Sequence, residues 1–183
     1  GFALPATVGR RVVETAVGGG RQVVRPWLGA RLQSVTPQMA EALGLHAPTG
    51  ALVGDVWRGG AADRAGLRSG DVVTRIDGQD VTDASAVIYA VGGHRPGETV
   101  QLEILREGQP RRLTLRAEAP PSSPRDERVI QGQNPLDGAT VANLSPALAE
   151  EQGLDPFSEG VLVTGIARGY AASYLRKGDI VKA

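Results

Sequence analysis

The chain contains an internal repeat, and this repeat limits the folds open to it more than any other feature. Residues 39–45 (MAEALGL) correspond to residues 148–154 (LAEEQGL). The run LRSGDVV at residues 67–73 returns as LRKGDIV at residues 175–181, in the same order along the chain. Agreement between ordered segments indicates a duplicated unit, so we expect two related domains.

The second copy is shorter than the first. After residue 71 the first copy predicts a strand over residues 72–76, a turn at Asp77-Gly78, a helix from Asp83 to His94 and a hairpin over residues 99–116. The second copy has no counterpart of these elements and is expected to be about half a domain. Such a half exposes strand edges, so we expect it to be weakly stable or to be completed by another chain.

Composition marks the expected boundaries. The segment at residues 118–128 is rich in Pro, Ser and charged residues, which predicts an interdomain linker. We therefore expect a first domain over residues 25–118, a linker over residues 119–134 and the second copy over residues 135–183. The pattern near the N-terminus predicts a short helix over residues 7–17 and a glycine hinge.

Charge and residue usage argue against several classes of function. Lys and Arg together number 20, as do Asp and Glu, so no basic surface for nucleic acid is expected. Cysteine is absent, which excludes disulfides and thiol nucleophiles. No apolar run approaches the roughly 20 residues of a membrane helix. The two histidines, His46 and His94, are interpreted as solvated loop residues, so we expect neither a metal nor a cofactor.

Residues 25–32 (RPWLGARL) carry the pattern with the clearest chemical meaning. An apolar–apolar–Gly–apolar turn that enters a strand can direct successive backbone N–H groups into one concavity, which binds carboxylates. An extended peptide can then add to the strand that follows. An ordinary turn before a strand explains the same four residues, and a buried anchor explains Trp27.

The order of elements in the first copy resembles that of the PDZ domain, and in particular the permuted PDZ form of the HtrA (Deg) family of serine proteases. The run GDVVTRIDG at residues 70–78 is the most specific part of this resemblance. The opening GFALP is similar to the segment that closes the protease domain in this family. The resemblance therefore implies that residues 1–24 are the end of a protease domain and a connector helix.

The fold that this resemblance implies is α+β: a small, mostly antiparallel β-sandwich or partial barrel capped by two helices, followed by an incomplete second PDZ copy. Carried over by position, residues 27–30 become the carboxylate-binding turn of the first domain, with Arg25 at its rim. The remaining implied site residues line the peptide groove or form the turn of the second copy. The turn of the first domain comprises Trp27, Leu28, Gly29 and Ala30; the groove residues are Arg31, Leu32, Val87, Ile88 and Val91; the second turn comprises Leu136, Asp137, Gly138 and Ala139.

The function that the resemblance implies is the capture of unfolded, extended or C-terminal peptides for an attached serine protease domain. It also implies a homo-oligomer in the periplasm or cell envelope of a bacterium. The alternative is a structural or oligomerisation module whose peptide grooves are occluded. The chain itself is expected to hold no catalytic residue, because no Gly-x-Ser-Gly-Gly segment occurs and its serines are interpreted as turn or cap residues.

Overall fold

The computed structural model describes residues 25–167 and 173–182. The chain divides into two compact units, Gly1–Ala119 and Pro120–Ala183. The helix and the glycine hinge expected near the N-terminus lie outside the described residues.

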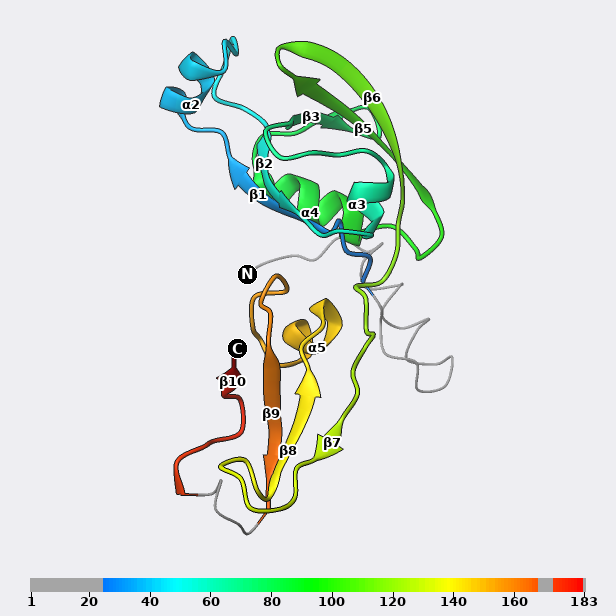
Figure 1. The fold of residues 1–183 in the computed structure, drawn as a ribbon. Helices are drawn as coiled ribbons and strands as arrows, with labels where there is room; N and C mark the ends of the chain where they lie inside the picture. The colour runs from blue at the N-terminus through cyan, green and yellow to red at the C-terminus, as the bar shows by residue number, and fades with distance from the viewer. Residues whose placement is uncertain (1–24, 168–172, 183) are drawn as a thin grey trace, which may run out of the picture. The chain divides into compact units, whose positions relative to one another are not determined.

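The first unit is built on one open antiparallel sheet (Figure 1). Its strands follow the order β1-β2-β3-β5-β6, and β4 pairs with β3. The expectation of a mostly antiparallel α+β fold is confirmed, but the sheet does not close into a barrel. The strands are β1 (Ala30–Ser34), β2 (Ala51–Val56), β3 (Val72–Ile76), β4 (Gln79–Asp80), β5 (Thr99–Arg106) and β6 (Gln109–Arg116).

Three short helices accompany this sheet in the described part of the first unit, where two were expected. They are α2 (Pro37–Ala42), α3 (Ala61–Arg64) and α4 (Ala84–Gly92). The Asp83 carboxylate accepts a hydrogen bond from the Ala86 N–H at 2.9 Å, so the predicted helix cap is present. The helix ends at Gly92, before the expected His94.

Both predicted hairpin turns are present. Asp77 and Gly78 have φ values of 48° and 78° between β3 and β4. The pair Glu107-Gly108 has φ values of 51° and 73° between β5 and β6. Two consecutive positive φ values match the right-handed twist of the flanking strands. Local turn chemistry therefore fixes the strand registers on both sides.

The core of the first unit is aliphatic. Its largest cluster joins residues of β2, β3 and β5 to Val87 and Val91 of α4. One buried ion pair interrupts the apolar interior: the Asp71 carboxylate is 1% exposed and binds the Arg106 guanidinium. This contact ties the start of β3 to the end of β5.

The second unit repeats the first half of this fold. Its strands are β7 (Arg128–Val129), β8 (Ala139–Asn143), β9 (Val161–Ile166) and β10 (Ile180–Val181), in the order β10-β9-β8-β7, with helix α5 (Pro146–Glu151). Equivalent hydrogen bonds recur with the same length. Gly70 donates its N–H to Val53 in the first unit and Gly178 donates to Val163 in the second, both at 2.9 Å. The internal repeat is thus a repeat of structure.

One feature of the second unit differs from the expected organisation. The linker was expected over residues 119–134, but β7 lies within that range and pairs with β8. Further back, the Arg125 carbonyl accepts a hydrogen bond from the Asn143 N–H at 2.8 Å. Segment 125–130 therefore belongs to the sheet and covers one edge of β8.

Candidate functional site

The turn at residues 27–30 enters β1 at the edge of the first sheet. Gly29 has a φ of 77°, a conformation that glycine adopts without the strain that a Cβ introduces. The Leu28 side chain is buried in the main core and anchors the turn. The Leu28 carbonyl accepts from the Ala62 N–H at 3.2 Å, and the Gly29 carbonyl accepts from the Trp57 N–H at 2.8 Å.

These two carbonyl contacts determine where the N–H groups of the turn point. In a trans peptide the C=O of one residue and the N–H of the next point in opposite directions. The N–H groups of Gly29 and Ala30 therefore point away from the segment that holds Trp57 and Ala62. Within the described part of the chain, the N–H groups of Leu28 and Gly29 donate to no protein acceptor, although both residues are buried. A buried donor without a partner is costly, so this turn is suited to an external acceptor.

Trp27 supports the turn from one side. Its N–H donates to the Glu118 carbonyl at 2.8 Å, which closes the domain start onto its end. Its ring packs edge-on against Trp57, with centroids 6.1 Å apart, and a Cβ at Gly29 would lie 3.5 Å from it. Sequence reasoning missed this role of Trp57. The one signal in the sequence was that a second tryptophan directly follows a predicted strand. Arg25 is exposed.

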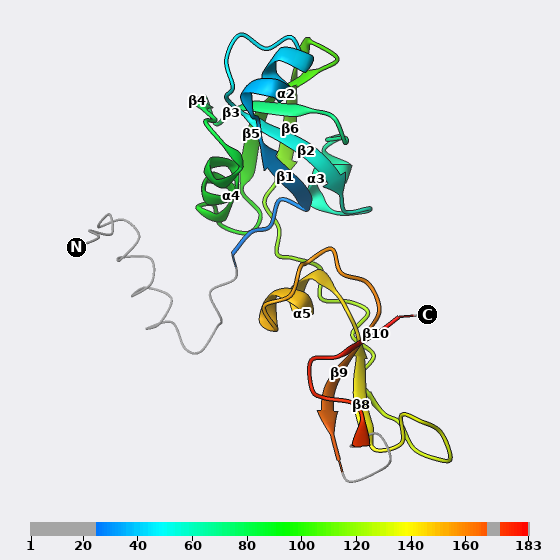
Figure 2. The ribbon, with the colours of Figure 1, turned by 90° about the vertical axis from the view of Figure 1, so that its left-hand side faces the viewer.

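Next to the turn, β1 and α4 run side by side, and this is where the sequence places the peptide groove (Figures 1 and 2). Among the described strands, β1 pairs with β2 on one edge only. The Ser34 hydroxyl accepts from the Ala84 N–H at 3.1 Å and fixes the start of α4 beside β1. Leu32 is half-buried against the core, whereas Arg31 is exposed and lies 3.7 Å from Asp55.

The three helix residues assigned to the groove occupy different environments. Val87 and Val91 are buried in the core, whereas Ile88 is 63% exposed. Of these three residues, Ile88 alone has a side chain exposed to solvent, so we expect Ile88 to meet a ligand, whereas Val87 and Val91 hold α4 on the core.

The second turn, at residues 136–139, has a different hydrogen-bonding state. The Gly138 N–H donates to the Ile130 carbonyl at 3.0 Å, and the Ala139 N–H donates to the Leu136 carbonyl at 2.9 Å. The Asp137 N–H donates to the Asn134 carbonyl at 3.1 Å. All three donors are occupied by the chain itself. The two turns occupy equivalent positions in the repeat, but only the first has backbone N–H groups without an acceptor in the described chain.

His94 is not the solvated loop residue that the sequence suggested. Its Nε2 lies 2.8 Å from the Asp77 carboxylate and its Nδ1 lies 3.3 Å from the Glu98 carboxylate. The hydrogen bond from the Arg95 N–H, together with His94, lowers the pKa of Glu98. The cluster fastens the chain beyond α4 to the β3–β4 turn, a contact between segments that sequence reading does not bring together.

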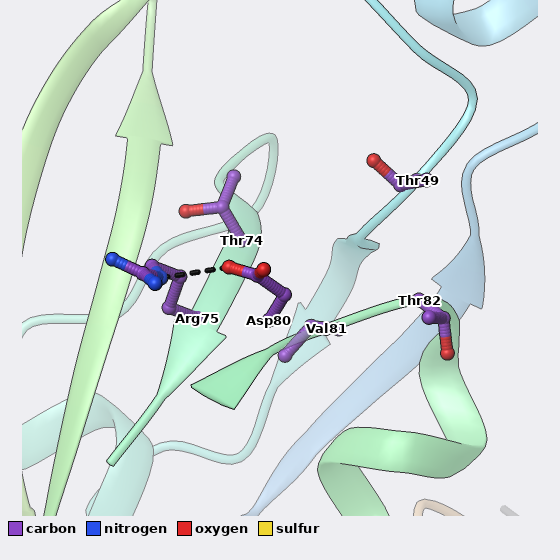
Figure 3. Close-up of a pocket in the computed structure, with 6 residues that line it drawn as sticks. All are labelled: Thr49, Thr74, Arg75, Asp80, Val81 and Thr82. Carbon is purple, nitrogen blue, oxygen red and sulfur yellow. Dashed lines mark hydrogen bonds and ion pairs between the residues drawn. The ribbon is translucent and has the colours of Figure 1, made fainter. Parts of the chain in front are cut away.

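A pocket of about 490 Å³ lies beside β3 and β4 (Figure 3). Figure 3 shows the Arg75 guanidinium facing the Asp80 carboxylate across this hairpin, at 2.7 Å. The Thr74 hydroxyl donates to the Glu103 carbonyl and the Thr82 hydroxyl donates to Asp83. The side chains of Thr74, Arg75, Asp80 and Thr82 in this pocket are thus paired with each other or with neighbouring residues.

Two further observations concern residues 25–167 and 173–182. These residues contain no group of three or more side chains arranged to hold a metal ion. None of their helices has both the length and the apolar character needed to cross a membrane.

Comparison with known proteins agrees with this geometry. Residues 26–116 match the family model of the PDZ domain. The chain is 33% identical over 188 residues to a probable periplasmic serine endoprotease DegP-like of Ectopseudomonas mendocina, covering 98% of this chain and 39% of that protein. It is 33% identical over 175 residues to the protein of the same name from Chlamydia trachomatis, covering 94% and 34%.

Solved structures give the same result. The HtrA-type protease AlgW with a tripeptide matches with a TM-score of 0.55 and 38% identity, over 66% of this chain and 40% of that one. The same protease with a decapeptide matches with a TM-score of 0.54 and 38% identity, over 66% and 37%. Residues 26–116 are a PDZ domain. The chain is related to the HtrA (Deg) family of serine proteases, and it spans less than two fifths of the length of the curated relatives described above.

Proposed function

We propose that the first unit binds extended peptides with a free C-terminus, which add as a strand to β1 and place their carboxylate in the turn at residues 27–30. The observation that carries this proposal is that two buried residues, Leu28 and Gly29, have backbone N–H groups with no acceptor in the described chain. A carboxylate supplies the acceptors that these donors lack, and a hydrogen bond to an ionised acceptor is stronger than one to a neutral group.

The open edge of β1 supports the rest of the proposed binding mode. A peptide that runs antiparallel to β1 would use its main-chain groups for affinity, as in other cases of strand addition. Its side chains would meet Leu32 on the strand and Ile88 on α4. Ala30 leaves more space beside the turn than a larger aliphatic residue would. The AlgW structures with a tripeptide and with a decapeptide also favour a peptide ligand.

In the whole protein, this unit would present unfolded or C-terminal peptides to an attached serine protease domain, or would regulate that domain. The names of the curated relatives support this role and a periplasmic location. We assign no catalytic residue to the chain itself, so the purified chain should hydrolyse no peptide. Assembly into a homo-oligomer belongs to the same proposal for the whole protein.

The direct test is fluorescence-polarisation binding of a C-terminal peptide library, each member paired with its C-terminally amidated form. We expect saturable binding that amidation weakens by at least about tenfold, which corresponds to about 1.4 kcal/mol. Equal binding of both forms would overturn the role of the turn. Binding by no peptide would favour the alternative function, a structural module whose groove is occluded.

A further inference from the structure

Segment 125–130 of the second unit occupies the position that a peptide would take in the first. Strand β7 pairs antiparallel with β8, with Arg128 opposite Val141 and Val129 opposite Thr140. Beyond β7, the Ile130 N–H donates to the Ala139 carbonyl at 2.8 Å, and the Ile130 carbonyl accepts from Gly138. Strand β8 is the counterpart of β1 in the repeat. The edge of β8 that β7 covers therefore corresponds to the edge of β1 to which a peptide is proposed to add.

The direction of this segment matches that of a ligand. A peptide held by its C-terminal carboxylate would run antiparallel to the strand and end at the turn. Segment 125–130 runs antiparallel to β8 and reaches the turn at Ile130. The Ile130 carbonyl oxygen meets the Gly138 N–H at 3.0 Å, where the carboxylate of a bound peptide would lie. The Ile130 side chain packs against the small core of the second unit, as a terminal side chain would.

The attachment of this segment is limited. Strand β7 has only two residues, both exposed, and Val129 is 56% exposed. The side-chain contact of Glu127 with the Thr164 hydroxyl, at 2.9 Å, lies at the surface. A short strand with exposed side chains is a low-stability element that opens locally. The segment is therefore placed to be displaced without unfolding the unit.

We propose that residues 125–130 are an internal ligand of the second unit, which closes its carboxylate-binding turn and opens only when a competing peptide displaces it. This inference rests on the proposed function of the first turn. The partner it predicts is a peptide with a free carboxylate and an aliphatic last residue, because Ile130 holds that place. A tethered segment competes at an effective concentration on the millimolar scale, so free peptides bind the closed unit far more weakly.

The first part of the test asks whether the closed form exists in solution. Since the chain has no cysteine, the double variant Val129→Cys/Thr140→Cys contains only the designed pair. Opposed residues of an antiparallel pair have Cα atoms about 4.5–5.5 Å apart, a separation that a disulfide spans. We expect this disulfide to form in air, and its out-of-register control, Val129→Cys/Asn143→Cys, to remain reduced. Equal oxidation of both would overturn the pairing.

The second part opens the site in the whole chain. Ile130→Pro removes the N–H that bonds Ala139, and Ile130→Ala is the control that keeps it. The probe is the hexapeptide RDERVI with a free carboxylate. Its binding is monitored through the NMR signals of the Gly138 and Gly29 amides. In Ile130→Pro we expect the Gly138 amide to exchange at least about tenfold faster than in the parent chain. We also expect the probe to bind this variant, as followed by the Gly138 signal, with an affinity at least about tenfold higher than that for the parent chain. Amidated RDERVI should not shift the signal.

The outcomes separate this inference from the proposed function. Shifts at Gly29 but none at Gly138 in Ile130→Pro would overturn the internal ligand and leave the first site standing. Shifts at neither residue would overturn the internal ligand, and the peptide library decides the first site separately. A Gly138 amide that exchanges freely in the parent chain would overturn the closed form regardless of any peptide. If Ile130→Pro unfolds the unit, the disulfide pair and the Gly138 exchange rate in the parent chain still decide whether segment 125–130 covers β8 in solution.

Discussion

The carboxylate of Asp71 accepts two hydrogen bonds from the guanidinium of Arg106, each 2.7 Å long, inside the first unit. The same carboxylate also accepts from the Arg68 N–H at 2.8 Å, and Arg106 donates to the Gly66 carbonyl at 2.7 Å. Hydrogen bonds from Arg106 to Asp71 raise the pKa of the guanidinium above its ordinary value. The pair joins the loop before β3 to the end of β5, so it stabilises the folded state of the first unit.

Removing one partner of this pair should leave a buried charge without compensation. We expect Asp71→Asn to lower the free energy of unfolding by about 3–5 kcal/mol. The matched control is Asp80→Asn, because the Asp80 ion pair with Arg75 is exposed and should cost at most about 1 kcal/mol. Chemical denaturation of both variants checks the prediction, and similar losses in the two would contradict it.

Gly29→Ala should act on the proposed site and on stability together. An alanine at a φ of 77° costs about 1–2 kcal/mol, and the strain would be relieved by turning the N–H groups out of place. We expect peptide affinity to fall at least tenfold. Gly44→Ala is the control, since Gly44 has a φ of 66° with open space around it and lies after α2. It should lose similar stability but keep peptide affinity; a loss of affinity in both variants would refute the assignment.

Ile88→Ala should weaken peptide binding without weakening the fold. The side chain is 63% exposed, so its removal leaves no cavity, but it would lose apolar contact with a bound peptide. We expect affinity to drop about fivefold with the melting temperature unchanged. Tyr89→Ala, at an adjacent residue that is 71% exposed, serves as control and should bind as the parent does, because neighbouring residues of a helix project about 100° apart. Binding titrations and thermal melts distinguish the two.

The cap of α4 should respond to acid. The hydrogen bond from the Ala86 N–H, helped by the Thr82 hydroxyl, lowers the pKa of Asp83 below its ordinary value of 3.8. A group whose pKa is lowered by folding contributes stability above that ordinary value and loses it as the pH falls through the lowered one. The Ala86 amide signal should therefore titrate with a midpoint below 3.8 in NMR spectra. Asp83→Asn keeps a cap but should show no such step. A midpoint at or above 3.8 would count against the cap.

Local sequence signals predicted local structure well. The pairs Asp77-Gly78 and Glu107-Gly108 gave their turns, and Asp83 gave a helix start, because each acts on its immediate neighbours. Helical spacing identified the apolar residues of α4 but did not separate the buried Val87 from the exposed Ile88. That distinction depends on which side of the helix packs on the core, and this is set by contacts with residues distant in sequence.

Contacts between distant segments were not predictable in this way. Nothing near Asp71 in sequence indicates that Arg106 reaches it, and nothing near His94 indicates Asp77. The pairing of β7 with β8 was missed because the composition of residues 118–128 is that of a linker, and composition does not report strand pairing. The peptide-binding role of the first turn stays a prediction, which the experiments above test.

The donors of the first turn are main-chain groups, and this has an evolutionary consequence. Substitutions at Ala30, Leu32 or Ile88 change the surface that a peptide side chain would meet, but they leave the N–H groups of Leu28 and Gly29 in place. Preference for particular sequences can therefore drift from one lineage to another while recognition of a chain end persists. A change at Gly29 itself displaces both N–H groups and so acts on recognition of the chain end directly. Variation should therefore be least tolerated at this glycine.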